Sequence, residues 1–128
     1  MTQHEMTHER MSATDDAMQA CIAMCTECHA TCLKTAMRCL DMGDPHAAPH
    51  HIGLLLDCAD ICRTSADFML RGSSMHAVTC GACAEICAAC AEECGRFTED
   101  FMQACAATCR RCAESCREMA AQGSHAGH

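Results

Sequence analysis

The chain has 128 residues, a formal net charge of −8 and 50% hydrophobic residues, which suits one domain with one core. The acidic balance excludes a nucleic-acid-binding face, because phosphate binding requires clustered basic residues. No stretch approaches the ~18 consecutive apolar residues of a membrane span, and no apolar run typical of a signal peptide follows the polar N-terminus. We therefore expect a cytoplasmic protein with no membrane or nucleic-acid partner.

Four helices are predicted in chain order, at about 14–42, 49–71, 75–95 and 99–122. Gly43 and Gly72 stop the first two, because glycine commonly follows the last helical residue. Ser73 or Ser74 is expected to cap the third helix, and Thr98 the fourth. The connections are short, so each helix should run antiparallel to the next.

This pattern predicts an all-α fold, an up-down-up-down four-helix bundle with a cysteine-lined core. The bundle covers residues 14–122, between flexible segments at 1–13 and 123–128. Leu, Ile, Val and Phe total only 14 residues, whereas the chain has 16 Cys and 11 Met. Because free cysteine behaves as a small, readily buried hydrophobe, we expect sulfur-containing side chains to fill the interior.

The cysteines recur at helical spacings of three and four residues, which are the spacings of positions that face a bundle core. All sixteen fall on such stripes: Cys21, Cys25, Cys28, Cys32, Cys39, Cys58, Cys62, Cys80, Cys83, Cys87, Cys90, Cys94, Cys105, Cys109, Cys112 and Cys116. Ordinary cores use Leu, Ile and Val, which bury more area per residue. Cysteine richness in a reducing compartment indicates metal binding before disulfides, so these positions are candidate metal ligands.

Three metals suit thiolate ligands. Zinc would close discrete four-ligand sites, and iron–sulfur clusters usually take cysteines from loops. Copper(I) accepts two or three sulfurs, and a thiolate can bridge two ions, which gives on the order of 16 ions, one per cysteine. One positive ion per thiolate also leaves the loaded core neutral.

Copper(I) storage or buffering is therefore the leading hypothesis, with a copper chaperone or a recipient copper enzyme as a further partner. A zinc-organised structural module and a thiol-redox protein are the alternatives. No Ser/His/Asp set indicates an enzyme, and His29 directly follows Cys28, so it should point away from the stripe.

Methionine and histidine extend the stripes beyond the cysteines at both ends of the predicted bundle. One end gathers Met18, Met69, His76 and Met119. Thioether and imidazole are suitable copper ligands, so this set either binds incoming copper or completes the core. The other end gathers Met42, His51 and Met102, with Phe97 and Phe101 as plugs. The histidines expected to be solvated are His4, His8, His46, His50, His125 and His128.

Four segments carry a resemblance to the bacterial four-helix-bundle copper storage proteins: 58–62 (CADIC), 66–73 (ADFMLRGS), 80–87 (CGACAEIC) and 109–116 (CRRCAESC). The resemblance implies inward-facing thiolates, copper(I) loading through one open end with Met or His at its mouth, and assembly into homotetramers. The chain resembles the cytosolic type. Family members often place a histidine just before the first cysteine of the last helix, where this chain has Phe101 and Met102.

Overall fold

The computed structural model describes residues 13–126, which form four α-helices and no strand. The helices are α2 (Ala13–Met42), α3 (Pro49–Leu70), α4 (His76–Gly95) and α5 (Asp100–Ala126). The predicted number, order and type of the helices are therefore confirmed. Helix α5 continues to Ala126, past the predicted domain boundary at residue 122. Except for Ala13, the N-terminal segment predicted to be flexible lies outside the described residues.

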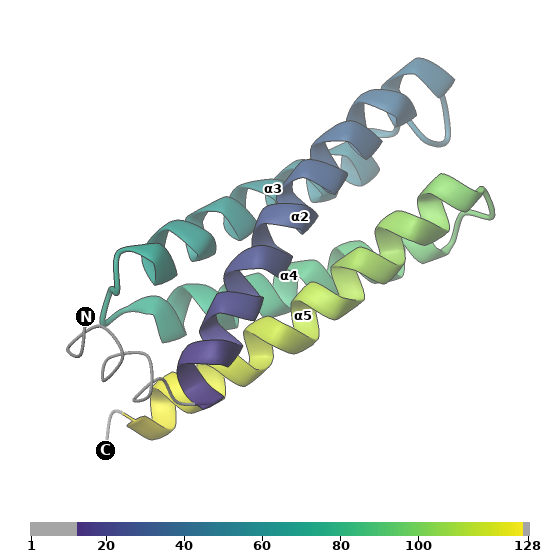
Figure 1. Ribbon diagram of the computed structural model, residues 1–128. Coiled ribbons are helices and arrows are strands. Elements are labelled where there is room, and N and C mark those ends of the chain that lie inside the picture. The colour runs from purple at the N-terminus through teal and green to yellow at the C-terminus, as the bar shows by residue number, and fades with distance from the viewer. Residues whose placement is uncertain (1–12, 127–128) are drawn as a thin grey trace, which may run out of the picture.

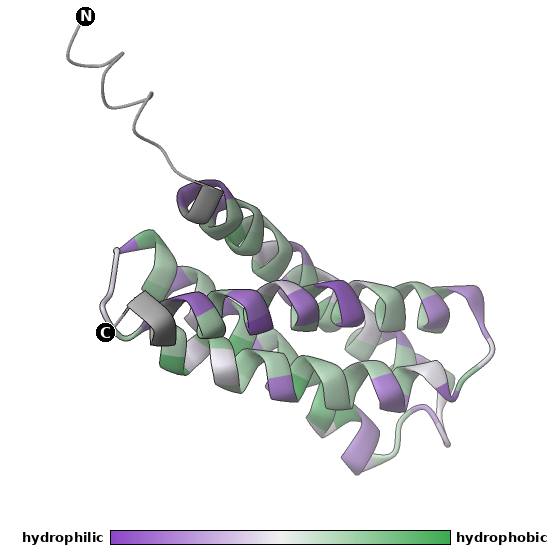
Figure 2. Cartoon of the chain, turned by 90° about the horizontal axis from the view of Figure 1, so that it is seen from below, coloured by the Kyte–Doolittle hydropathy of each residue, from purple (hydrophilic) through white to green (hydrophobic). Residues whose placement is uncertain are grey.

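The helices form an antiparallel bundle in which each one packs against two neighbours (Figure 1). Helix α2 packs against α3 and α5, and α4 packs against the same two, so the diagonal pairs α2/α4 and α3/α5 face each other across the core. In Figure 2 hydrophilic segments alternate with hydrophobic ones along the helices, as expected of amphipathic helices around one core. The predicted fold class is confirmed.

The glycines predicted to stop the first two helices adopt positive φ angles, 79° at Gly43 and 66° at Gly72. At the end of α3 the N–H of Gly72 donates to the carbonyl of Met69, and the N–H of Ser73 donates to that of Phe68. These two bonds form a Schellman motif, which requires a left-handed residue such as glycine. The helix therefore ends where the sequence predicts.

The predicted N-caps of the last two helices are wrong. Met75 occupies the cap position of α4 and makes no capping bond through its side chain, whereas Ser73 accepts a hydrogen bond from the Met75 N–H in the preceding turn. Helix α5 begins at Asp100, so Glu99 rather than Thr98 precedes it, and the Glu99 carbonyl accepts the first helical bonds. Both errors displace a helix start by one or two residues and leave the core stripes unchanged.

The core consists mainly of cysteine and alanine. Its largest fully buried side chains include Leu55, Met102, Met119 and His51. Alanines at Ala59, Ala84, Ala106 and Ala113 flank the cysteines and have no bulk to hold the helices apart. Small residues beside the stripes therefore allow thiols from different helices to meet.

Candidate metal centre

Every cysteine lies in the interior of the bundle. All sixteen are 0% exposed and all are free thiols. Helix α2 supplies five of them, α3 two, α4 five and α5 four, on the stripes expected from the sequence. The inward placement of the candidate ligands is therefore as predicted.

Twelve of the sixteen thiols gather in groups whose sulfur atoms all lie within 4.8 Å of one another, whereas Cys39, Cys90, Cys94 and Cys105 belong to none of these groups. The four groups are Cys21/Cys80/Cys116, Cys25/Cys83/Cys112/Cys116, Cys28/Cys62/Cys87/Cys112 and Cys28/Cys32/Cys58/Cys109. Each group draws on at least three helices, and one draws on all four. Such groups have the donor type and spacing to hold a soft metal ion.

Consecutive groups share a cysteine. Cys116 belongs to the first and second groups, Cys112 to the second and third, and Cys28 to the third and fourth. We call this connected series of four groups the thiol ladder. Because each shared sulfur faces two groups, the ladder is suited to bridging thiolates rather than to separate, closed sites.

Contacts between helices are as short as those within a helix. Cys25 Sγ lies 3.5 Å from Cys116 Sγ, and Cys62 Sγ lies 3.5 Å from Cys87 Sγ. The same-helix pair Cys83 and Cys87 is 3.6 Å apart. Sequence spacing identified the same-helix pairs only, because pairing between helices depends on how each helix is rotated and shifted in the bundle.

Burial disfavours the charged form of a thiol, whereas hydrogen bonds with neighbouring thiols lower the pKa of some of them, such as Cys28 and Cys83. Burial raises the pKa of Cys39 from an ordinary 9.0 to about 11. Hydrogen bonding with Cys112 raises the pKa of Cys62 above the ordinary thiol range, and burial adds to the effect. A thiolate in this interior therefore needs a bound cation to balance its charge.

We call the end of the bundle with Met18, Met69, His76 and Met119 the methionine end. Antiparallel topology brings the four residues to this end from four different helices. Met69 and Met119 are buried, whereas Met18 and His76 are half-buried. His76 Nδ1 lies 3.0 Å from the Ser73 carbonyl and donates to it, which leaves Nε2 available to a ligand.

The opposite end, which we call the His51 end, has a different set of donors. His51 Nε2 lies 3.3 Å from Cys39 Sγ, and Met102 Sδ lies 3.6 Å from the same sulfur. His51 Nδ1 lies 3.1 Å from a carboxylate oxygen of Glu93, a residue that sequence analysis did not single out. In the sequence, its position directly before the core cysteine Cys94 was the available signal. The imidazole at this end comes from α3, not from the last helix.

Two expectations about the His51 end are wrong. Met42 is 45% exposed, so it does not line the core. His46 is only 8% exposed, with its ring centroid 4.4 Å from that of Phe97 and its Nε2 2.9 Å from Glu99 Oε2. His46 is therefore a packed side chain rather than a solvated one.

The expectation for His29, in the middle of the bundle, is confirmed. His29 donates from Nδ1 to the Ala59 carbonyl at 2.7 Å, so its side chain points away from the cysteine stripe.

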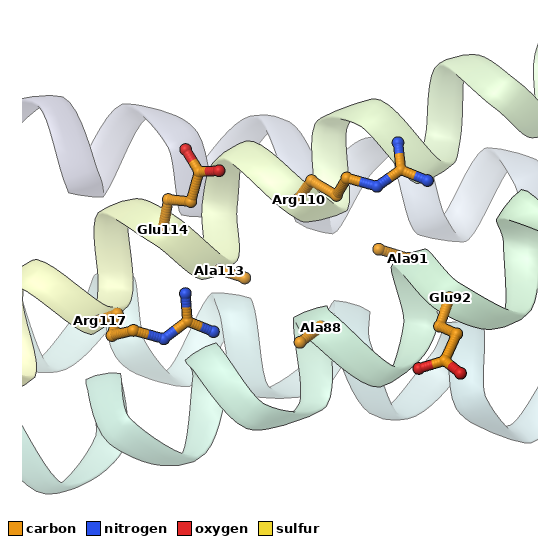
Figure 3. A pocket seen from close by; sticks show the side chains of 7 residues that line it. All are labelled: Ala88, Ala91, Glu92, Arg110, Ala113, Glu114 and Arg117. Carbon is orange, nitrogen blue, oxygen red and sulfur yellow. The ribbon is translucent and has the colours of Figure 1, made fainter.

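The groove shown in Figure 3 lies on the outside of the bundle, between α4 and α5. It has a volume of about 300 Å³, and Arg110, Arg117, Glu92 and Glu114 line it together with alanines. Opposite charges mixed in this way are typical of a solvated helix surface, and no cysteine lines this groove. The metal-binding candidates are therefore inside the bundle.

Comparison with solved structures gives close matches over most of the chain. The Nmul_A1745 protein of Nitrosospira multiformis is 50% identical, with a TM-score of 0.81 over 84% of this chain and 98% of that one. The copper(I)-bound copper storage protein BsCsp3 is 39% identical, with a TM-score of 0.77 over 81% and 98%. A cytosolic copper storage protein from Streptomyces lividans with five coppers is 33% identical, with a TM-score of 0.75 over 83% and 93%.

Comparison with curated proteins gives no match. The helices of residues 13–126 lack the combination of length and apolarity that a bilayer crossing requires.

The sequence profile described as "Copper storage protein" matches residues 6–121, nearly the whole chain. Together with the bundle and its buried thiols, this match shows that the chain belongs to the copper storage protein family.

Proposed function

We propose that the chain stores copper(I) along the inside of the bundle, at about one ion per cysteine and on the order of 16 ions in total. The sharing of Cys28, Cys112 and Cys116 between neighbouring groups is the observation that carries this proposal. If each thiolate bridges two ions and each ion binds two thiolates, ions and thiolates are equal in number. The loaded interior is then neutral, which avoids the large free-energy cost of buried charge. Storage of this kind is binding and release, without a catalytic step.

Titration of the reduced, metal-free protein with copper(I) under nitrogen tests this proposal. A chromophoric copper(I) chelator in the solution should stay uncoloured until about 16 equivalents per chain have been added. Saturation at one or two ions would instead indicate a chaperone or a sensor.

Zinc is a second candidate for the sulfur groups, and the group Cys28/Cys32/Cys58/Cys109 has distances that suit it. Cys28 Sγ lies 3.8 Å from Cys58 Sγ and from Cys109 Sγ, and Cys32 Sγ lies 3.7 Å from Cys109 Sγ. A zinc–sulfur bond of about 2.3 Å gives a tetrahedral S···S edge of about 3.8 Å, which matches these distances. Purified protein that retains about four zinc ions and unfolds when they are chelated would support zinc as the structural metal.

We further propose that the protein works in a reducing compartment, the cytosol, where its thiols stay free. Sixteen free cysteines and the 33% identity to the cytosolic Streptomyces lividans protein support this location. A copper chaperone or a recipient copper enzyme would exchange ions with the store. Expression of a fluorescent fusion should give a diffuse cytosolic signal, and a signal at the cell envelope would contradict the proposal.

Homotetramer assembly is also a proposal, made on the family resemblance. Leu33, Met37 and Leu40 form an apolar stripe on α2 at spacings of four and three residues, and they are 38%, 53% and 47% exposed. Contact with another copy would cover this stripe. Light scattering should give the mass of four chains, and the 13.8 kDa of one chain would refute assembly.

Copper is proposed to load at the methionine end, where Met18, Met69, Met119 and His76 would pass ions from weak thioether or imidazole ligands to thiolates. Changing the three methionines together to Leu keeps apolar volume, so the fold should survive. We expect stopped-flow uptake to slow by about tenfold, while capacity stays the same because the thiols remain.

The matched control is the triple variant with Leu at Met24, Met37 and Met42, none of which is buried, and it should load at the wild-type rate. Equal rates in the two triple variants and the wild type would show that the methionines at this end serve only in packing.

A further inference from the structure

The His51 end contains a buried donor set that differs in kind from the thiol ladder. Cys39 belongs to none of the four sulfur groups. Its sulfur instead lies 3.3 Å from the imidazole Nε2 of His51 and 3.6 Å from the thioether of Met102. Three helices supply the three side chains, and all are at most 1% exposed. A thiol, an imidazole and a thioether thus converge on one small interior volume.

The orientation of His51 is set by a carboxylate behind it. Glu93 Oε2 lies 3.1 Å from His51 Nδ1, and the other oxygen, Oε1, accepts a hydrogen bond from the Arg96 guanidinium at 2.7 Å. A proton on Nδ1 is donated to this carboxylate, and Arg96 in turn pairs with the same carboxylate. The lone pair of Nε2 then points towards Cys39. Carboxylate-anchored histidines of this kind are typical metal ligands.

We propose that Cys39, His51 and Met102 form a separate copper(I) site of mixed nitrogen and sulfur donors, with Glu93 as the residue that positions His51. One thiolate neutralises the charge of one copper(I) ion, and the imidazole and the thioether add neutral donors, so the loaded site carries no net charge. The half-buried ring of Phe97 packs beside the site, with its centroid 4.7 Å from that of His51.

This inference rests on the proposed copper(I) function, and its test separates the two. Copper(I) is diamagnetic, so long-range proton–nitrogen NMR spectra of the nitrogen-15-labelled protein can be recorded before and after loading. We expect the Nε2 resonance of His51 to shift on loading, while Nδ1 keeps its proton. The His51→Gln variant, which lacks this resonance, supplies the assignment. His29 is the internal control, because its Nδ1 is committed to the Ala59 carbonyl and its signals should stay unchanged.

Two variants test the other members of the site. Met102→Leu keeps the buried volume and removes only the thioether, and Glu93→Leu removes the acceptor behind Nδ1. We expect each to weaken the one copper(I) ion of this site by about 10–100-fold in chelator competition, with the ladder ions unaffected. In Glu93→Leu the nitrogen resonances of His51 should also show a mixture of the Nδ1–H and Nε2–H tautomers. A loss of packing alone would not cause this change.

The outcomes are distinct. Loading of many ions with an unshifted His51 Nε2, and with wild-type competition curves for Met102→Leu, would overturn the mixed site and leave copper storage standing. A shifted His51 Nε2 at a capacity of one or two ions would support the mixed site and overturn storage. If His51→Gln does not fold, the wild-type shift and the Met102→Leu variant still decide.

Discussion

Copper(I) loading is expected to raise the thermal midpoint of unfolding of this protein by more than ~20 °C, while its helix content hardly changes. Ions that bind the folded bundle much more tightly than the unfolded chain stabilise it by about 2.7 kcal/mol for each independent site filled at 100 times its Kd. Several such sites add more than ~10 kcal/mol, and each kcal/mol moves the midpoint of a domain of this size by about 2–8 °C. Circular dichroism melts of metal-free and loaded protein measure the difference.

The metal-free protein should already be helical, because its protonated thiols serve as core hydrophobes. A random-coil spectrum that becomes helical only with metal would contradict this prediction.

The stability of the metal-free protein should fall as the pH rises from about 9 to about 11. The unfolded Cys39 thiol ionises near 9.0, whereas burial raises the pKa of this thiol to about 11 in the folded state. The folded state therefore holds its proton more tightly, and this contribution is complete below pH 9 and lost above 11.

The helical stripes and their inward placement could be predicted from sequence because they depend on local spacing. A cysteine three or four residues from the next lies on the same side of a helix whatever the helix packs against. Gly43 and Gly72 likewise mark helix ends through their own backbone preferences, and both have positive φ angles in the structure.

The features that sequence reasoning missed depend on how helices and loops meet. Nothing in the spacing of Cys28 shows that its sulfur belongs to two groups, because that depends on the rotation of all four helices. His46 was expected to be solvated because it lies in the loop between the first two helices, yet this loop packs its ring against Phe97. Glu93 looks like one of many acidic surface residues until His51 and Arg96 are placed beside it.

The shared sulfurs also distinguish a continuous copper store from a set of separate sites. Changing Cys28, Cys32, Cys58 and Cys109 together to Ala is expected to lower the copper(I) capacity by about four ions, a quarter of the total. In a bridged, charge-neutral interior, each lost thiolate removes one ion. Each substitution also leaves a small cavity and destabilises the metal-free bundle by on the order of 1 kcal/mol. Anaerobic titration against a chelator, after circular dichroism has established folding, measures the loss.

The matched control changes three exposed threonines, Thr26, Thr64 and Thr98, to Ala, which should leave the capacity unchanged. A loss of one ion from the four-cysteine variant would mean that this group is an isolated four-ligand site, as zinc coordination would require. A loss of about four ions would mean that one ion is held for each thiolate charge.

Because Cys28 also belongs to the group with Cys62, Cys87 and Cys112, ions held there should dissociate more readily in the variant than in the wild type. Unchanged affinity at that neighbouring group would show that the shared sulfur does not bridge.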